Sequence, residues 1–413
     1  MSKKVIITAI PLRQRLCRIT AVKEDGIVTQ IQLAGREREN LLGNIYIGKV
    51  EKIQENIRAA FVRIAPGLTC YYPMPEHPGN GVLNRRCDGR LLPGDEIMVQ
   101  VEKEALKEKL PGVTTNLSFT GKYLVLTSGR KDLGLSGKLD NESKRVLRMW
   151  IEPLMEEDFG AIVRTNAKFA GKQELLEEFD YLKQRLRRVM ETGRSRTCYS
   201  LLERTPEDYI QLLRDTAGEE LTEIVTDDEE VYQTAASYLE QFQPGDRQKL
   251  TFYEDALLPL VKLHSLERAL SEALREKVWL KSGGFLVIQQ TEAFVVIDVN
   301  SGKYTGKKKA QETYRRINLE AAAEIARQML LRQLSGIILI DFINMQSEDH
   351  KQELLHVLQK YCRKDPVKTV VVDMTALNIV EVTRQKVKKS LAEQAAELDW
   401  KGETGWKNSG DGN

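Results

Sequence analysis

Two apolar runs, each ending in an aspartate, constrain the fold of this chain more than any other feature. They are FVVIDVNSG around Asp298 and GIILIDFINM around Asp341, and the helical segment AQETYRRINLEAAAEIARQMLLRQL lies between them. Runs of four or five Val, Ile and Phe residues are typical of fully buried parallel strands. The sequence therefore predicts a β-α-β unit, in which a right-handed crossover makes the two strands neighbours in one sheet.

Both aspartates fall at the carboxyl edge of this predicted sheet, which is where open α/β sheets bind their ligands. Two carboxylates a few ångströms apart repel each other unless a cation lies between them, and hard oxygen ligands favour Mg²⁺, with Mn²⁺ as the alternative. Each aspartate could instead only cap the element that follows it. Asp373 ends a third apolar run, TVVVDMT, which predicts a third buried strand. By position alone Asp373 would be a third metal ligand.

The length and composition indicate a soluble protein of several domains. The chain has 413 residues, 30% of them charged, with a formal net charge of only +2, and domains hold about 150 residues each. No apolar run approaches the roughly 20 residues of a membrane span, and the start, MSKKVIITAI, lacks the features of a signal peptide. We therefore expect cytoplasmic residence. The widely spaced cysteines indicate neither a disulfide framework nor a zinc site.

Basic residues gather at two places in the last third of the chain. One group follows Asp298 and consists of Lys303, Lys307, Lys308, Lys309, Arg315 and Arg316. The other consists of Arg384, Lys386, Lys388 and Lys389. A basic run is usually a solvated surface, but beside a metal centre it would neutralise the phosphate backbone of a nucleic acid.

The N-terminal half has the pattern of β-structure. The first 35 residues alternate like two antiparallel strands of a sheet that is completed elsewhere. Residues 43–100 contain several short strands separated by turns, which predicts a small closed barrel of the OB type. Such barrels stack the bases of single strands on aromatic side chains, and Tyr46, Phe61 and Tyr71 are candidates unless they are buried in the barrel.

Three stretches together resemble the catalytic region of the ribonuclease E/G family over nearly the whole chain. They are TEAFVVIDVNSG, INLEAAAEIARQ with LRQLSGIILIDFINM, and NIVEVTRQ. The resemblance implies a multidomain α/β and β protein with an S1 (OB-type) barrel, a 5′-sensor, an RNase H-like subdomain and a DNase I-like α/β catalytic domain. The expected boundaries are 1–38 for N-terminal strands that pair with the RNase H-like subdomain, 39–104 for the S1 domain, 105–200 for the sensor, 201–277 for the RNase H-like subdomain, 278–395 for the catalytic domain and 396–413 for a disordered tail.

The resemblance also implies roles for particular residues. Asp298 and Asp341 match the metal-binding aspartates, and Asn300 matches the asparagine that assists at the scissile phosphate. The positions that contact a 5′-monophosphate are matched by Gly121, Val125, Arg164 and Thr165. The S1-region positions that grip RNA are matched by Phe61, Tyr71 and Lys109, with tyrosine at 71 where the family has phenylalanine.

The chain departs from the family pattern in three ways. Lys368 stands where the catalytic domain supplies a sensor arginine, which keeps the charge but loses the bidentate geometry. No cysteine follows Cys362, so the CPxC zinc-link motif is absent, and the small domain after it is missing too. In the family these parts build the dimer and tetramer. We therefore expect no zinc, and any oligomer to form without a zinc link.

The expected function is Mg²⁺-dependent endonucleolytic cleavage of single-stranded RNA, in RNA processing and decay. A metal-activated water would attack in line and leave a 5′-phosphate and a 3′-hydroxyl. Asn300 lies two residues past Asp298 on an extended segment and faces the same way, so its amide could steady the phosphate charge. The alternative is an S1-type RNA-binding protein of the family that has lost cleavage. A nucleotide phosphotransferase is disfavoured because GKYTGKKK lacks the spacing of a phosphate-binding loop.

Overall fold

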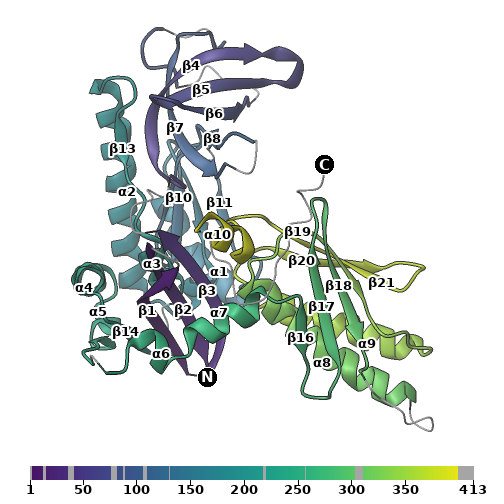
Figure 1. The fold of residues 1–413 in the computed structure, drawn as a ribbon. Helices are drawn as coiled ribbons and strands as arrows, with labels where there is room; N and C mark the ends of the chain where they lie inside the picture. Colours follow the sequence, from purple (N-terminus) through teal and green to yellow (C-terminus); the bar gives the residue numbers. More distant parts are fainter. Residues whose placement is uncertain are drawn as a thin grey trace. The chain divides into compact units, whose positions relative to one another are not determined.

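The computed structural model (Figure 1) divides into two compact units, residues 39–218 and residues 1–38 with 219–413. The described residues are 2–12, 15–35, 41–75, 81–86, 89–105, 109–129, 131–216, 220–255, 257–302 and 310–398. None of the helices in these ranges is long and apolar enough to span a bilayer.

A closed barrel forms the first part of the unit 39–218. Five strands of the described chain close it in the order β4 (Ile45–Gln54), β5 (Ala59–Ala65), β6 (Leu68–Pro73), β8 (Gly112–Thr114) and β7 (Glu96–Lys103), with β7 pairing back onto β4. A short 3₁₀ turn (Glu55–Ile57) joins β4 to β5, and β13 (Leu201–Glu203) pairs with β4. The barrel therefore takes β8 from beyond residue 104, where the sequence placed the end of this domain.

Tyr46 belongs to the core of this barrel. Its side chain is 7% exposed and packs among the inward residues of β5 and β7, and Asn44 Nδ2 donates to its hydroxyl at 3.3 Å. The prediction of Tyr46 as a base-stacking residue is wrong, because the pleat of β4 turns this side chain inward.

A second sheet and a long helix complete the unit 39–218. The sheet order is β11 (Leu133–Leu135), β12 (Gly160–Val163), β10 (Leu124–Thr127) and β9 (Ser118–Thr120). The helices are α1 (Asn141–Ile151), α2 (Lys172–Ser195) and α3 (Asp208–Thr216), with 3₁₀ turns at Glu152–Leu154 and Thr165–Phe169. The helix α2 buries a stripe at the helical spacing, consisting of Leu175, Phe179, Leu182, Leu186 and Val189.

The N-terminal strands form one sheet of the other unit. Its order is β15 (Leu250–Phe252), β14 (Leu221–Thr226), β1 (Lys3–Leu12), β2 (Arg15–Glu24) and β3 (Ile27–Gly35). The strands β1, β2 and β3 are antiparallel, and β14 runs parallel to β1. The helices that follow in sequence are α4 (Glu229–Phe242), α5 (Pro244–Arg247), α6 (Leu260–Leu263) and α7 (Leu266–Leu274).

The C-terminal helix α10 (Leu391–Glu397) packs against β3 in the same unit. Residues 396 and 397 are thus helical, although the sequence placed them in a disordered tail. The rest of that predicted tail, from residue 399 onward, lies outside the described residues.

The second sheet of this unit carries both aspartates. Its order is β16 (Lys277–Trp279), β17 (Phe285–Gln290), β18 (Phe294–Asn300), β19 (Gly336–Asp341), β21 (Ile379–Arg384) and β20 (Thr369–Met374). The strands β18 and β19 are parallel and are joined through α8 (Ala310–Leu331), whereas the other neighbouring strands of this described sheet are antiparallel. The predicted β-α-β unit is confirmed.

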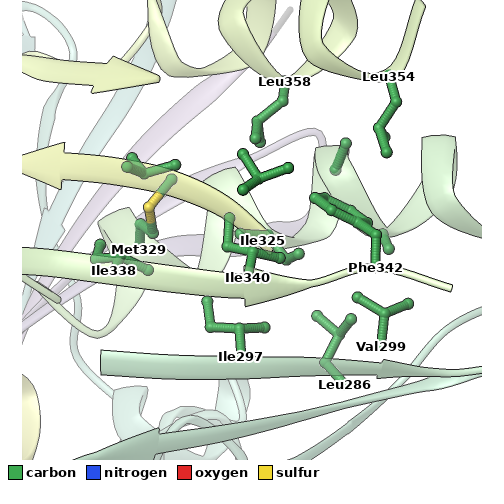
Figure 2. Close-up of a cluster of buried hydrophobic side chains, with 14 of the residues drawn as sticks. Leu286, Ile297, Val299, Ile325, Met329, Ile338, Ile340, Phe342, Leu354 and Leu358 are labelled. Carbon is green, nitrogen blue, oxygen red and sulfur yellow. The ribbon is translucent and has the colours of Figure 1, made fainter. Parts of the chain in front are cut away.

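The helices α8 and α9 (Glu348–Cys362) cover one face of this sheet (Figure 1). Figure 2 shows the core between the sheet and these two helices. Strand residues such as Ile297 and Ile340 meet Ile325 of α8 and Leu358 of α9 there. Alternate residues of the same strands point away from the helices and are exposed, namely Phe294 (42%), Val296 (36%) and Ile337 (45%). We call this second face the open face.

The prediction that these strands are buried on both faces is therefore wrong. In the part of the chain that the structure describes, one layer of helices packs on the sheet, so the apolar runs contribute every second residue to the core. The third run forms β20, an edge strand in which Val370 and Val372 are 42% and 55% exposed, and not a buried strand.

Candidate active site

Asp298 and Asp341 lie directly opposite each other in the parallel ladder of β18 and β19. Neighbouring strands are about 4.8 Å apart. Their flanking residues Ile297, Val299 and Ile340 belong to the core under the helices, so the alternation of a strand turns both carboxylates onto the open face. The structure thus brings the two predicted carboxylates together.

Asn300 lies beside this pair on the same face. Its Nδ2 donates a hydrogen bond to Asp298 Oδ2 at 2.6 Å. A side-chain amide carries two N–H donors, so one holds the Asp298 carboxylate and a second can reach a ligand on the open face.

The turn between β16 and β17 packs closely against the backbone that carries Asn300. A Cβ added at Gly284 would lie 2.8 Å from the carbonyl oxygen of Asn300, which explains why a glycine stands there. The carboxylate of Glu320, in α8, accepts hydrogen bonds from the backbone N–H groups of Lys281 (2.6 Å) and Ser282 (3.2 Å). This turn is therefore bonded to α8 and packs against the end of β18.

Asn318 of α8 holds the segment that follows Asp341. Its side chain is completely buried, its Nδ2 donates to the carbonyl oxygen of Ile343 at 2.7 Å, and its Oδ1 accepts from the N–H of Ile343 at 3.1 Å. Ile343 lies two residues past Asp341, so the helix fixes the chain just beyond this carboxylate. Our sequence reasoning missed Asn318 and Glu320. The sequence feature that could have revealed them is the presence of polar residues within the apolar stripe of INLEAAAEIARQ.

The donor set at this position suits a hard divalent cation. Two carboxylates face each other, and no described lysine or arginine forms an ion pair with either. The described residues contain no group of three or more His, Cys, Asp and Glu side chains that could hold a metal ion. Mg²⁺ commonly keeps several water ligands, so a cation held by Asp298 and Asp341 can complete its coordination with water or substrate.

Asp373 lies away from this pair. It is on β20, and β21 separates β20 from β19. Its Oδ1 accepts a hydrogen bond from the N–H of Met374 at 2.7 Å. Two strand spacings amount to roughly 10 Å, so Asp373 is not placed as a third ligand in the pair.

The second basic group predicted from the sequence is largely neutralised within the fold. Arg384 is 3% exposed, bonds Asp365 through Nε at 2.7 Å and donates to the carbonyl oxygen of Leu334 at 2.8 Å. Lys386 and Lys389 form ion pairs with glutamates of α10. Arg384 is therefore a buried structural residue and not part of a phosphate-binding surface, and two of the three lysines form ion pairs within the fold.

The first basic group is only partly described. Lys303 and residues 307–309 lie outside the described residues. Arg315 forms ion pairs with Glu353 (2.6 Å) and Glu312 (3.0 Å), and Arg316 is exposed.

In the unit 39–218, the structure brings Arg164 and Gly121 into contact. Arg164 Nη1 donates to the carbonyl oxygen of Gly121 at 2.6 Å, and Nη2 donates to Asp215 Oδ1 at 2.7 Å. Burial opposes the ionisation of Asp215, but Arg214 and Arg164 together hold its pKa below the usual range of an aspartate. A phosphate at Arg164 would therefore share the guanidinium with an ionised carboxylate.

Two of the other predicted sensor residues lie near Arg164 in the same unit. Thr165 follows Arg164, and its hydroxyl and that of Ser136 are 2.8 Å apart. Val125 is on β10 and pairs with β12, the strand that leads into Arg164. Lys368 is exposed and belongs to the other compact unit.

Glu178 supports the Gly121 turn and was missed by our sequence reasoning. Its carboxylate accepts hydrogen bonds from three consecutive backbone N–H groups, those of residues 122, 123 and 124, each at 2.8 Å. Burial raises the pKa of Glu178, and these donors oppose that rise. A Cβ at Gly121 would lie 2.4 Å from Glu178 Oε1. Gly121 is therefore required by the packing of this carboxylate.

On the barrel, Phe61 and Tyr71 are direct cross-strand partners on β5 and β6. Both are partly exposed, and their ring centroids are 6.4 Å apart with the planes at 75°. The N–H of Tyr71 donates to the carbonyl oxygen of Pro111 at 2.8 Å, so the segment that carries the exposed Lys109 runs beside β6. The structure thus gathers the three predicted RNA-contacting residues in one region of the barrel.

The chain matches known proteins over most of its length. Residues 118–387 match the model of the ribonuclease E/G family. The chain is 33% identical to ribonuclease G of Escherichia coli K12 over 407 residues, which cover 95% of this chain and 81% of the relative. It is 31% identical to ribonuclease G of Haemophilus influenzae (90% and 78% covered) and 31% identical to ribonuclease E of Nostoc sp. PCC 7120 (91% and 55%). The chain belongs to the ribonuclease E/G family.

Proposed function

We propose that this protein is a metal-dependent endoribonuclease that cleaves single-stranded RNA. The observation that carries the proposal is the register of Asp298 opposite Asp341 on the open face, with Asn300 bonded to Asp298. The relatives at about one-third identity, which are named ribonuclease G and ribonuclease E, support the choice of RNA as substrate.

Asp298 and Asp341 would hold a Mg²⁺ ion, or Mn²⁺ in its place. Such an ion polarises a phosphodiester oxygen and lowers the pKa of a bound water. Asn300 orients the Asp298 carboxylate through one amide N–H and can donate the other to the scissile phosphate. Attack by water in line with the leaving 3′-oxygen leaves a 3′-hydroxyl on one product and a 5′-phosphate on the other.

The barrel would hold the single strand. Phe61 and Tyr71 offer partly exposed rings on adjacent strands for base stacking, and Lys109 offers a positive charge for the backbone. This binding mode tolerates many sequences, because every base has a face that can stack. It agrees with a general role in RNA processing and decay in the cytoplasm, on messenger and ribosomal RNA.

The site at Arg164 would sense a 5′-monophosphate. A guanidinium has five N–H donors, and the described acceptors at Gly121, Lys122 and Asp215 engage three of them. The remaining two can bind a phosphate, with Thr165, Val125 and Lys368 as the further contacts that the family resemblance implies. Sharing the guanidinium with Asp215 would make this binding modest.

A direct test is to incubate the protein with an A/U-rich single-stranded RNA that carries a 5′-monophosphate, with and without Mg²⁺, and to map the product ends. We expect internal cuts that require Mg²⁺ and leave 5′-phosphate and 3′-hydroxyl ends. A matched duplex should resist cleavage. Binding without cleavage would identify an RNA-binding member of the family instead, and cyclic 2′,3′-phosphate ends would contradict attack by water.

A further inference from the structure

An aromatic pair with a lysine lies on the open face, close to Asn300, and consists of the exposed Trp279 and the partly buried Phe285. Trp279 and Phe285 have ring centroids 5.3 Å apart, and Lys277 Nζ lies 4.2 Å from the Trp279 ring and 3.7 Å from the Phe285 ring. Trp279 is 65% exposed. A large aromatic side chain with that exposure contributes little to the core, and such residues commonly mark binding surfaces.

The strand register connects this pair to the proposed active site. Trp279 on β16 lies opposite Phe285 on β17, and Phe285 lies opposite Asn300 on β18. Strands are about 4.8 Å apart, so Phe285 is one spacing and Trp279 two spacings, roughly 10 Å, from the strand that carries Asn300 and Asp298. The three side chains form one row across the sheet that ends at the proposed phosphate position.

The hairpin fixes the direction of these side chains. The N–H of Leu280 donates to the carbonyl oxygen of Gly284 at 2.8 Å, which closes the turn between β16 and β17. Leu280 is buried in the core under α8, and Val278 packs against that core. The alternation of the strand therefore turns Lys277 and Trp279 onto the open face.

We propose that Trp279, Phe285 and Lys277 form a stacking subsite for a nucleobase beside the scissile phosphate of single-stranded RNA. This inference rests on the proposed function and extends it. The two rings offer faces for a base, and the ammonium group supplies the positive charge that a neighbouring phosphate needs. The same charge disfavours a purely apolar partner on these rings, which is why the charge pattern points to RNA and not to a second apolar protein surface.

The test is an abasic scan. In a single-stranded RNA with one mapped cleavage site, each nucleotide near that site is replaced in turn by an abasic residue, and kcat/KM is measured. In the wild type, one abasic position beside the cut should lower kcat/KM by about fivefold to a hundredfold, which corresponds to the loss of one base stacked on an aromatic ring. In Trp279→Ala the normal RNA should lose a comparable factor, and the abasic change should have no further effect. Trp279→Phe should restore part of the penalty.

Tyr361→Ala is the matched control. Tyr361 is an aromatic residue near a lysine, with Lys364 Nζ at 5.7 Å from its ring, but it lies on α9, on the covered side of the same sheet. This variant should keep the full abasic penalty. Circular dichroism and the thermal midpoint should show that each variant is folded before its kinetics are compared.

The same scan is repeated with RNA-binding affinity as the readout, measured by fluorescence anisotropy. It uses the Asp341→Asn background, in which we expect no cleavage, so that the subsite and the proposed cleavage are judged separately. If the wild type cleaves RNA but the abasic penalty persists in Trp279→Ala, the subsite is wrong and the function stands. If the wild type does not cleave but binding shows a penalty that depends on Trp279, the function fails and the subsite stands. A Trp279→Ala variant that changes the oligomeric state by light scattering, with its abasic penalty intact, would overturn the proposal in favour of self-association.

Discussion

Replacing Asn318 with alanine should impair both the stability of the sheet that carries Asp298 and Asp341 and the placement of Asp341. Asn318 is fully buried and bonds both backbone groups of Ile343, two residues past Asp341. The alanine variant leaves an N–H and a carbonyl oxygen unpaired in the interior and opens a space of the size of an amide group. The segment after Asp341 is then free to shift toward new partners, and the carboxylate moves with it.

The magnitude follows from the two lost partners. An unpaired buried polar group costs about 1–3 kcal/mol, so the free energy of unfolding should fall by roughly 2–6 kcal/mol. For a unit of this size, each kcal/mol lowers Tm by about 2–4 °C, so a loss of about 4 kcal/mol lowers it by roughly 8–16 °C. Asn318→Asp should be no better, because it sets a carboxylate oxygen against the carbonyl of Ile343.

The assay combines thermal unfolding with kcat, measured well below the Tm of the variant. Gln328→Ala is the matched control, because Gln328 is also buried on α8 and bonded to Glu324 and Arg332, about ten residues or roughly 15 Å along the helix. We expect both variants to lose stability and only Asn318→Ala to lose kcat. Wild-type kcat in folded Asn318→Ala, or an equal loss in Gln328→Ala, would refute this role.

Three further predictions concern other parts of the chain. Gly284→Ala should lower kcat, because its Cβ would lie 2.8 Å from the carbonyl oxygen of Asn300. Gly137→Ala should not lower kcat, because a Cβ there meets nothing within 4 Å. Equal kinetics in the two variants would contradict this reasoning. Arg164→Ala should lower kcat/KM for 5′-monophosphorylated RNA by about tenfold to a hundredfold, because a contact worth roughly 1.5–3 kcal/mol is lost. The value for 5′-hydroxyl RNA should not change. If the wild type has nearly the same kcat/KM for both substrates, Arg164 has a structural role instead. Metal analysis with light scattering should find no stoichiometric zinc and no dimer that a chelator dissociates, and one zinc per two chains would disprove that expectation.

The sequence was sufficient to predict the carboxylate pair because every step was local. The apolar runs define two strands, and the segment between them has the period of a helix. A right-handed crossover then makes the two strands parallel neighbours in one sheet. The register of Asp298 opposite Asp341 confirms this arrangement. The open face was not predictable in this way. Whether a second layer covers a sheet depends on the rest of the chain, and a run of Val and Ile residues looks the same in both cases.

The residues that were missed or misread have partners that leave no pattern in the sequence. Asn318 and Glu178 bond to backbone groups, which every residue carries, so nothing at the partner positions reveals the contact. Arg384 looked like part of a basic surface because its carboxylate partner, Asp365, is distant in sequence and meets it only in the folded sheet. Tyr46 was misread because the inward face of β4 is set by the closure of the barrel onto β7.

The most direct test of the central claim is the Mg²⁺ dependence of RNA cleavage by the wild type, Asp298→Asn and Asp341→Asn. Asp373→Asn is the matched control, since Asp373 is an aspartate in the same sheet, with β21 between its strand and β19. Replacing either carboxylate of the facing pair removes a charged ligand, so both variants should lose cleavage at every Mg²⁺ concentration while their affinity for RNA is retained. Asp373→Asn should cleave like the wild type. Cleavage by Asp298→Asn or Asp341→Asn at a rate near that of the wild type would contradict the account.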